Sequence, residues 1–113
     1  MFRDKPLEKR KDIFQSLMRE KSDRVAVVML NGNNNSALKL QKKKYLIPAN
    51  MTLCNFMVEI KSRLKMNSEE ALFITFNGKI YAQSITMGEI YVDCKDPEDG
   101  FLYGTYNVEN TFG

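Results

Sequence analysis

The feature that most constrains the fold is an amphipathic segment in the middle of the chain. Its apolar residues recur at the spacing of one helical face: Leu53, Phe56, Met57, Ile60 and Leu64. Thr52 precedes them and suits the N-cap of a helix. A helix with one apolar face must bury that face against another element, and the short apolar segments on either side predict a sheet.

Four segments have the composition of β-strands, namely residues 24–30, 45–47, 72–76 and 101–106. The first is continuously apolar after Arg24, which predicts a buried strand. Pro48 has no amide proton, so it should end the second strand or mark a sheet edge. Turn sequences separate these segments, among them Asn77-Gly78.

Two further helices are expected. Residues 7–21 follow Pro6, which suits the first helical position, and they carry an apolar stripe of Ile13, Phe14, Leu17 and Met18. A shorter helix, ending near Cys94, begins with a capping box formed by Thr86 and Glu89.

The order of these elements predicts an α+β fold. It is a ubiquitin-like β-grasp (ββαβαβ) with an added N-terminal helical segment. We expect three parts: residues 1–23 as a helical extension packed on the core, residues 24–106 as the ubiquitin-like domain, and residues 107–113 as a flexible C-terminal tail.

Composition argues against an enzyme. The 113 residues suit one domain, and they include no histidine, which removes the commonest general base and zinc ligand. We therefore expect no catalytic residue, no metal site and no cofactor. The two cysteines, Cys54 and Cys94, suit a reducing cytosolic setting and are expected to be buried packing residues. No secretory signal or membrane-spanning run is expected, so another group must supply any membrane attachment.

Charge is unevenly distributed along the chain. Residues 1–65 hold 15 Lys and Arg against 6 Asp and Glu, whereas residues 66–113 hold 2 against 8. The asymmetry suggests a basic surface that meets acidic partners, although charge alone slightly favours a solvated face without a partner. A small basic nucleic-acid-binding domain is one alternative, but no RNA-binding motif is present and no nucleic acid is expected.

Seven short segments together resemble the autophagy-related protein 8 family, whose relatives include GABARAP and microtubule-associated protein light chain 3. They are residues 8–11 (EKRK), 23–25 (DRV), 43–48 (KKYLIP), 70–74 (EALFI), 86–91 (TMGEIY), 99–103 (DGFLY) and 109–113 (ENTFG). They keep the order and approximate spacing of the family over nearly the whole chain.

The resemblance implies a ubiquitin-like modifier of autophagy. A deconjugating cysteine protease, an activating enzyme and a conjugating enzyme of the autophagy pathway would be its partners. They would join Gly113 to the amine of phosphatidylethanolamine, with Thr111 and Phe112 recognised in the tail. Glycine lacks Cβ, so such a tail can enter a narrow active site. The protein would be a monomer in the cytoplasm and, once lipidated, would lie on autophagosome membranes.

The resemblance also implies a peptide-binding groove. The second strand is expected at a sheet edge, where an extended peptide can add. Cargo receptors of relatives bind there through a motif of the form aromatic-x-x-aliphatic. The aromatic pocket would be lined by Leu17, Ala26, Val28, Lys44, Leu46 and Phe101. The aliphatic pocket would be lined by Tyr45, Ile47, Pro48, Met51 and Phe56, with Arg63 nearby. Acidic residues beside the motif would meet Arg10, Arg24, Lys42, Lys43 and Lys44.

Three residues depart from the family pattern in this groove. Ile13 stands where relatives often place an acidic residue, Ala26 replaces a common proline, and Glu59 replaces an aliphatic residue. We expect altered motif preference or weaker affinity. Plain core packing is the alternative role of the apolar residues. A ubiquitin-like adaptor that binds peptides without being lipidated is the alternative to the modifier.

Overall fold

The computed structural model describes residues 2–19, 23–32 and 39–110. Its elements are η1 (Phe2–Asp4), α1 (Leu7–Met18), β1 (Arg24–Asn31), β2 (Lys44–Pro48), α2 (Leu53–Leu64), β3 (Glu70–Phe76), α3 (Met87–Cys94) and β4 (Leu102–Asn110). The predicted order of helices and strands is confirmed, and the three-residue 3-10 helix η1 is the element that the sequence did not predict.

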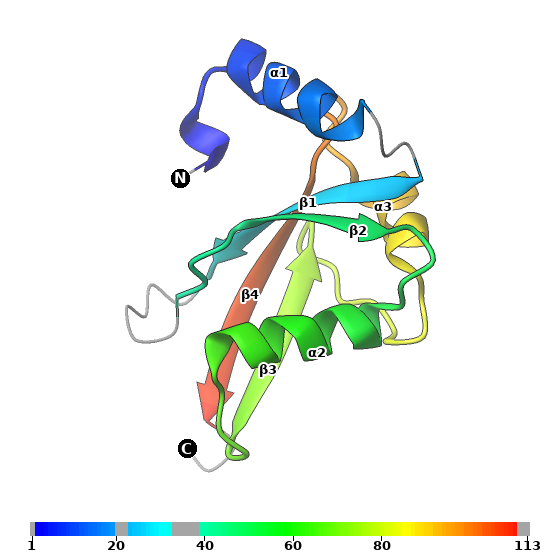
Figure 1. Ribbon diagram of the computed structural model, residues 1–113. Coiled ribbons are helices and arrows are strands. Elements are labelled where there is room, and N and C mark those ends of the chain that lie inside the picture. The colour runs from blue at the N-terminus through cyan, green and yellow to red at the C-terminus, as the bar shows by residue number, and fades with distance from the viewer. Residues whose placement is uncertain (1, 20–22, 33–38, 111–113) are drawn as a thin grey trace.

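The four strands form one mixed sheet in the order β2-β1-β4-β3. β1 and β4 are parallel neighbours, with Val28 opposite Tyr103, and each also pairs antiparallel with its outer neighbour. This is the predicted ubiquitin-like α+β arrangement. β2 lies at one edge of the sheet and β3 at the other (Figure 1).

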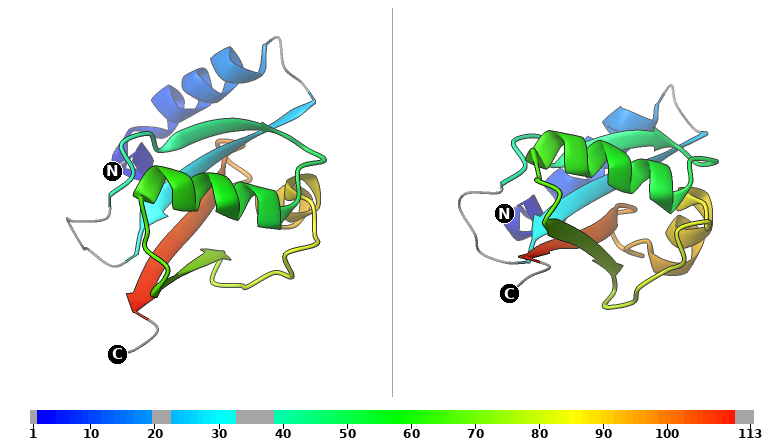
Figure 2. Two further views of the ribbon diagram at one scale, coloured as in Figure 1. Left: turned by 60° about the horizontal axis from the view of Figure 1, so that its bottom comes forward. Right: turned by 90° about the horizontal axis from the view of Figure 1, so that it is seen from below.

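Helices cover both faces of the sheet at β1. Side chains alternate between the faces of a strand, so Val25, Val27 and Met29 enter the main core with α2 and α3, whereas Ala26 and Val28 face the other way. On that second side they form the N-terminal cluster, which comprises Phe2, Ala26, Val28, Phe101 and Tyr103. Figure 2 shows α1 and α2 on opposite sides of β1 and β2. Burial on both faces explains why β1 is apolar from Val25 to Leu30.

Both predicted N-caps are present. The hydroxyl Oγ1 of Thr52 accepts from the amide of Asn55 at 3.2 Å, and that of Thr86 accepts from the amide of Glu89 at 3.2 Å. The carboxylate of Glu89 in turn accepts from the amide of Thr86 at 3.0 Å, which completes the capping box. These bonds fix where α2 and α3 begin. α2 ends at Leu64, and Lys65 caps it in the left-handed conformation with φ 54°.

Three local expectations were wrong. Residues 107–110 are part of β4 and pair with β3, with Val108 opposite Leu72, rather than forming a free tail. Tyr106 and Val108 alternate toward the main core, so the strand pattern continues beyond residue 106. α1 ends at Met18, whereas the prediction continued to residue 21. Cys94 is buried as expected, but Cys54 is exposed.

Candidate functional site

The edge strand β2 exposes backbone groups on its outer side. The amide of Met29 donates to the carbonyl of Lys43 at 2.8 Å, so the backbone at Lys43 faces β1. Backbone direction alternates along a strand, and the backbone groups of Lys44 and Leu46 therefore point away from the sheet. The carbonyl of Leu46 accepts from the Arg24 guanidinium at 3.3 Å. Within the described residues no strand pairs with this outer side.

A hollow of about 320 Å³ lies beside β2, between that strand and α2. Its lining includes all six residues that were predicted for the aliphatic pocket: Tyr45, Ile47, Pro48, Met51, Phe56 and Arg63. Tyr45 and Ile47 reach it because they alternate onto the α2 face of β2. The structure thus brings the predicted residues together in one apolar depression.

The rim of this hollow is mostly cationic. Arg63 and Lys42 place their charged groups 5.4 Å and 5.3 Å from the centre of the Tyr45 ring, within cation–π range. The hydroxyl of Tyr45 donates to the carbonyl of Lys42 at 2.6 Å, and burial raises the pKa of Tyr45. Glu59 is the one acidic residue in the described lining, and it pairs with Arg63 at 2.8 Å. The rim therefore favours a ligand with negative charge beside an apolar side chain.

The residues predicted for the aromatic pocket lie on the opposite side of β2. Ala26, Val28 and Phe101 belong to the N-terminal cluster, and Leu17 and Leu46 pack against it. Lys44 is exposed at the start of β2, but its amine lies 5.2 Å from the centre of the Phe2 ring. The structure brings these residues together, and side chains of the N-terminal segment cover them.

The predicted cations for an acidic flank differ in how available they are. Lys42 and Lys43 are exposed, whereas Arg24 lines the hollow and donates to the carbonyl of Leu46. Arg10 is different because its guanidinium Nη1 donates to the enclosed carboxylate of Asp99 at 2.7 Å. The side chain of Arg10 is 15% exposed. Its charge is already matched inside the protein, so it is poorly placed to meet a peptide.

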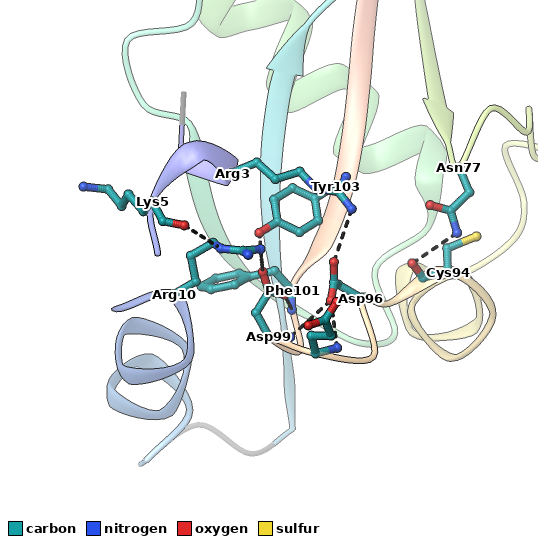
Figure 3. A network of polar contacts seen from close by, with 10 residues as sticks. Arg3, Lys5, Arg10, Asn77, Cys94, Asp96, Asp99, Phe101 and Tyr103 are labelled. Carbon is teal, nitrogen blue, oxygen red and sulfur yellow. Dashed lines mark hydrogen bonds and ion pairs between the residues drawn. The ribbon is translucent and has the colours of Figure 1, made fainter. Parts of the chain in front are cut away.

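Asp99 is the centre of a polar network that ties the N-terminal segment to β4 (Figure 3). Its carboxylate accepts from the amide of Phe101 at 2.9 Å and from the hydroxyl of Tyr103 at 2.5 Å. The pKa of Tyr103 is raised to about 12, first by burial and then by this bond to Asp99. The guanidinium of Arg3 lies 4.3 Å from the centre of the Tyr103 ring and also pairs with Asp96 at 3.2 Å.

Comparison with known proteins identifies the family of the chain. A family model described as "Autophagy protein Atg8 ubiquitin like" matches residues 9–113. The chain belongs to this family. Autophagy-related protein 8 of Neurospora crassa is 40% identical over 113 residues, covering 99% of this chain and 93% of that protein. Autophagy-related protein 8 of Dictyostelium discoideum is 38% identical, covering 97% and 90%.

A solved structure gives the same result in three dimensions. The crystal structure of Trypanosoma brucei ATG8 superposes with a TM-score of 0.85 at 31% identity, covering 97% of this chain and 94% of that one. The predicted fold and the resemblance to the autophagy-related protein 8 family are thereby confirmed. The chain is a ubiquitin-like protein of autophagy.

Some predicted functional residues of this family member lie outside the described part of the chain. These are Thr111, Phe112 and Gly113. In the ranges 2–19, 23–32 and 39–110, no helix is long and apolar enough to cross a membrane. The same ranges contain no cluster of side chains that could hold a metal ion.

Sequence reasoning missed the residues that cover the aromatic pocket. Phe2 and Phe14 both meet the ring of Phe101 edge-on, with centroids 5.0 Å and 5.4 Å away. Phe14 was recognised in the apolar stripe of α1 but not connected with the pocket. For Phe2 the available signal was a large apolar residue in an otherwise polar start. Asp99 lies in a charged stretch before β4, and nothing in the sequence indicates that it is buried.

Proposed function

We propose that this chain is a ubiquitin-like modifier of autophagy, conjugated through Gly113 to phosphatidylethanolamine on autophagosomal membranes. In this proposal it recruits cargo receptors by binding their aromatic-x-x-aliphatic motifs along β2. One observation carries the binding half: an unpaired sheet edge runs beside an apolar hollow of about 320 Å³ with a cationic rim. These are the features that strand addition requires.

A bound motif would use three parts of the surface. Its backbone would bond with the outward backbone groups of Lys44 and Leu46. Its aliphatic side chain would fill the hollow against Ile47 and Met51, which removes apolar surface from water. Acidic residues beside the motif would meet Arg24, Lys42 and Lys43. Ionised partners strengthen hydrogen bonds, so these contacts would add affinity that declines with salt.

The conjugation half rests on the family and on the sequence at the end of β4. An activating and a conjugating enzyme would supply the nucleotide chemistry and the thiol, and the chain would supply only the carboxyl group of Gly113. The thioester would be attacked by the lipid amine, with an amide formed and the thiol released. Two acyl chains then give stable anchoring, which one chain would not. The protein would cycle between cytoplasm and autophagosome membrane.

A reconstituted reaction tests conjugation. The full chain is mixed with activating and conjugating enzymes, ATP and liposomes that contain phosphatidylethanolamine, and intact mass is measured. We expect a gain equal to the lipid minus water, lost when Gly113 is deleted. If enzymes that are active on a related modifier give no adduct, the chain is an adaptor that binds peptides without being lipidated.

A titration tests the groove. The probe is a synthetic peptide with a Phe-x-x-Leu core and acidic flanks. Met51→Glu places a charge in the hollow and should weaken binding at least tenfold, because the leucine of the peptide would leave that charge desolvated. Val58→Glu is the matched control, since Val58 is a 60% exposed residue of α2 outside the hollow lining. Equal affinities for both variants would remove the hollow from the binding site.

A further inference from the structure

The side chain of Phe2 is buried although it lies in a short segment rich in charge. It is 7% exposed, within the three-residue helix η1. Its ring meets Phe101 edge-on, with centroids 5.0 Å apart and planes at 76°. The amine of Lys44 lies 5.2 Å from the centre of the same ring. Phe101 and Lys44 are two of the six residues expected to line the aromatic pocket.

The other pocket residues also belong to the surroundings of Phe2. Ala26 and Val28 share the N-terminal cluster with it, and Leu17 and Leu46 pack against that cluster. An incoming aromatic side chain would need the same contacts, namely the edge of Phe101 and the cation of Lys44. Two rings cannot occupy one volume. Phe2 and a motif aromatic residue therefore exclude each other.

We propose that Phe2 is an internal ligand of the aromatic pocket, which a motif peptide must displace before it can bind with both of its anchor residues. The proposal rests on the proposed peptide-binding function and adds its regulation. The groove thus has two unlike halves. The aliphatic side is an open hollow, and the aromatic side is closed by the first segment of the chain.

The contacts that hold Phe2 in place suit a reversible closure. One contact of η1 beyond the ring is made by Arg3, whose side chain is 51% exposed while it pairs with Asp96 and stacks on Tyr103. On another side, Phe2 borders a hollow of about 240 Å³, so its ring is not enclosed all round. Displacing η1 breaks no β-sheet pairing, since it belongs to no strand.

The cost of displacement appears as reduced affinity. When only a fraction of molecules has the pocket open, the apparent dissociation constant is the intrinsic one divided by that fraction. An open population of about 1–10% therefore weakens binding by roughly 10- to 100-fold. A substitution that removes the ring of Phe2 or weakens the contacts of η1 should therefore increase the affinity for the peptide by up to the same factor.

The first test compares Phe2→Ala with the natural chain. The probe is the acidic-flanked Phe-x-x-Leu peptide, and affinity is measured by calorimetry. Phe2→Ala should bind about tenfold tighter or more, whereas Phe73→Ala, which removes a 43% exposed ring on β3, should bind like the natural chain. An Ala-x-x-Leu peptide does not need the aromatic pocket and should show no gain with Phe2→Ala.

A second variant separates displacement from loss of core packing. Arg3→Gln keeps the ring of Phe2 but removes the ion pair with Asp96 and the stacking on Tyr103. It should also bind the Phe-x-x-Leu peptide several-fold tighter. Lys5→Gln is the control, because it removes the same charge from an exposed neighbour. If Phe2 served only the core, both Phe2→Ala and Arg3→Gln would bind equally or more weakly.

A third experiment observes the ring directly. The sequence contains no tryptophan, so Phe2→Trp introduces a single indole fluorophore. Its emission should be that of a buried indole, and the Phe-x-x-Leu peptide should shift it toward the red as the indole enters water. If the peptide binds without any shift, Phe2 is not displaced and the proposal is wrong, while the groove stands. If no form of the chain binds the peptide, both the groove and its internal ligand are wrong.

Discussion

Arg10 of α1 and Asp99 of the turn before β4 form an ion pair of 2.7 Å whose carboxylate is fully enclosed. The two residues are 89 positions apart in the sequence. The same carboxylate accepts hydrogen bonds from the hydroxyl of Tyr103 and the amide of Phe101, so one acidic side chain connects α1, the turn and β4. The pKa of Arg10 is raised by the neighbouring hydroxyl of Tyr103 and further by Asp99. The N-terminal segment is held against the sheet by this pair.

Asp99→Asn should destabilise the fold by about 2–4 kcal/mol, because it leaves the partly buried guanidinium of Arg10 without a counter-charge. The measurement is the free energy of unfolding from urea titration. Glu98→Gln removes one negative charge from the exposed neighbouring position and should change that free energy little. Similar losses in both variants would show that the pair does not hold α1 in place.

Alkaline pH should weaken the fold through Tyr103. An unfolded tyrosine loses its proton near pH 10, whereas the pKa of Tyr103 in the folded chain is about 12. Between these values the folded state binds more protons, so the free energy of unfolding falls as pH rises from about 10 to 12. Below pH 10 the stabilisation is fully present. Other tyrosines and lysines titrate in the same range, so Tyr103→Phe is compared with the natural chain to isolate this group. Between about pH 10 and 12 the free energy of unfolding should fall less steeply for Tyr103→Phe than for the natural chain.

Two glycines with positive φ should respond differently to alanine. Gly100 has φ +86°, and a Cβ there would lie 2.8 Å from the ring of Phe14. Gly78 has φ +75°, and a Cβ added there would have no neighbouring atom within 4 Å. Gly78→Ala should therefore cost only the backbone strain of about 1 kcal/mol. Gly100→Ala should cost about 1–3 kcal/mol more, because it displaces a packed ring. Urea unfolding of the pair measures the difference, and equal costs would mean that Phe14 moves freely.

Glu59 should restrain the affinity of the groove for acidic peptides. Its carboxylate pairs with Arg63 at 2.8 Å on the rim of the hollow, and both side chains are about half exposed. Glu59→Gln should leave stability within about 0.5 kcal/mol. It should tighten binding of acidic-flanked Phe-x-x-Leu peptides a few-fold at low salt, because Arg63 is released and the local negative charge is gone. A neutral-flanked peptide is the control, and an equal gain for both peptides would contradict the electrostatic cause.

Local chemistry made the elements of this fold predictable. The stripe of α2, the caps at Thr52 and Thr86 and the apolar run of β1 each lie within one segment, where spacing alone reveals the buried side. The strand expected over residues 101–106 covers only the strongest apolar run of β4, which extends to Asn110. The continuing alternation of Tyr106 and Val108 contained the missing information.

The sequence predicted which residues come together at the candidate site, but not which of the two pockets is covered. The resemblance to the family indicated both pockets by residue, and the structure gathers the two sets on opposite faces of β2. That alternation follows from the period of a strand. Which pocket is open follows from neither the period nor the resemblance, since it depends on what the N-terminal segment covers.

By itself, then, the sequence determined the order of the helices and strands, the fold class and the residues that line the hollow beside β2, because these depend on short-range periodicity and on segments shared with a family. Only the tertiary structure decided that Phe2 lies against Phe101 and that Asp99 is enclosed by Arg10 and Tyr103. The physical reason is that burial and pairing depend on which distant segments meet in space, and a charged turn or a single apolar residue has no local signal for its partner.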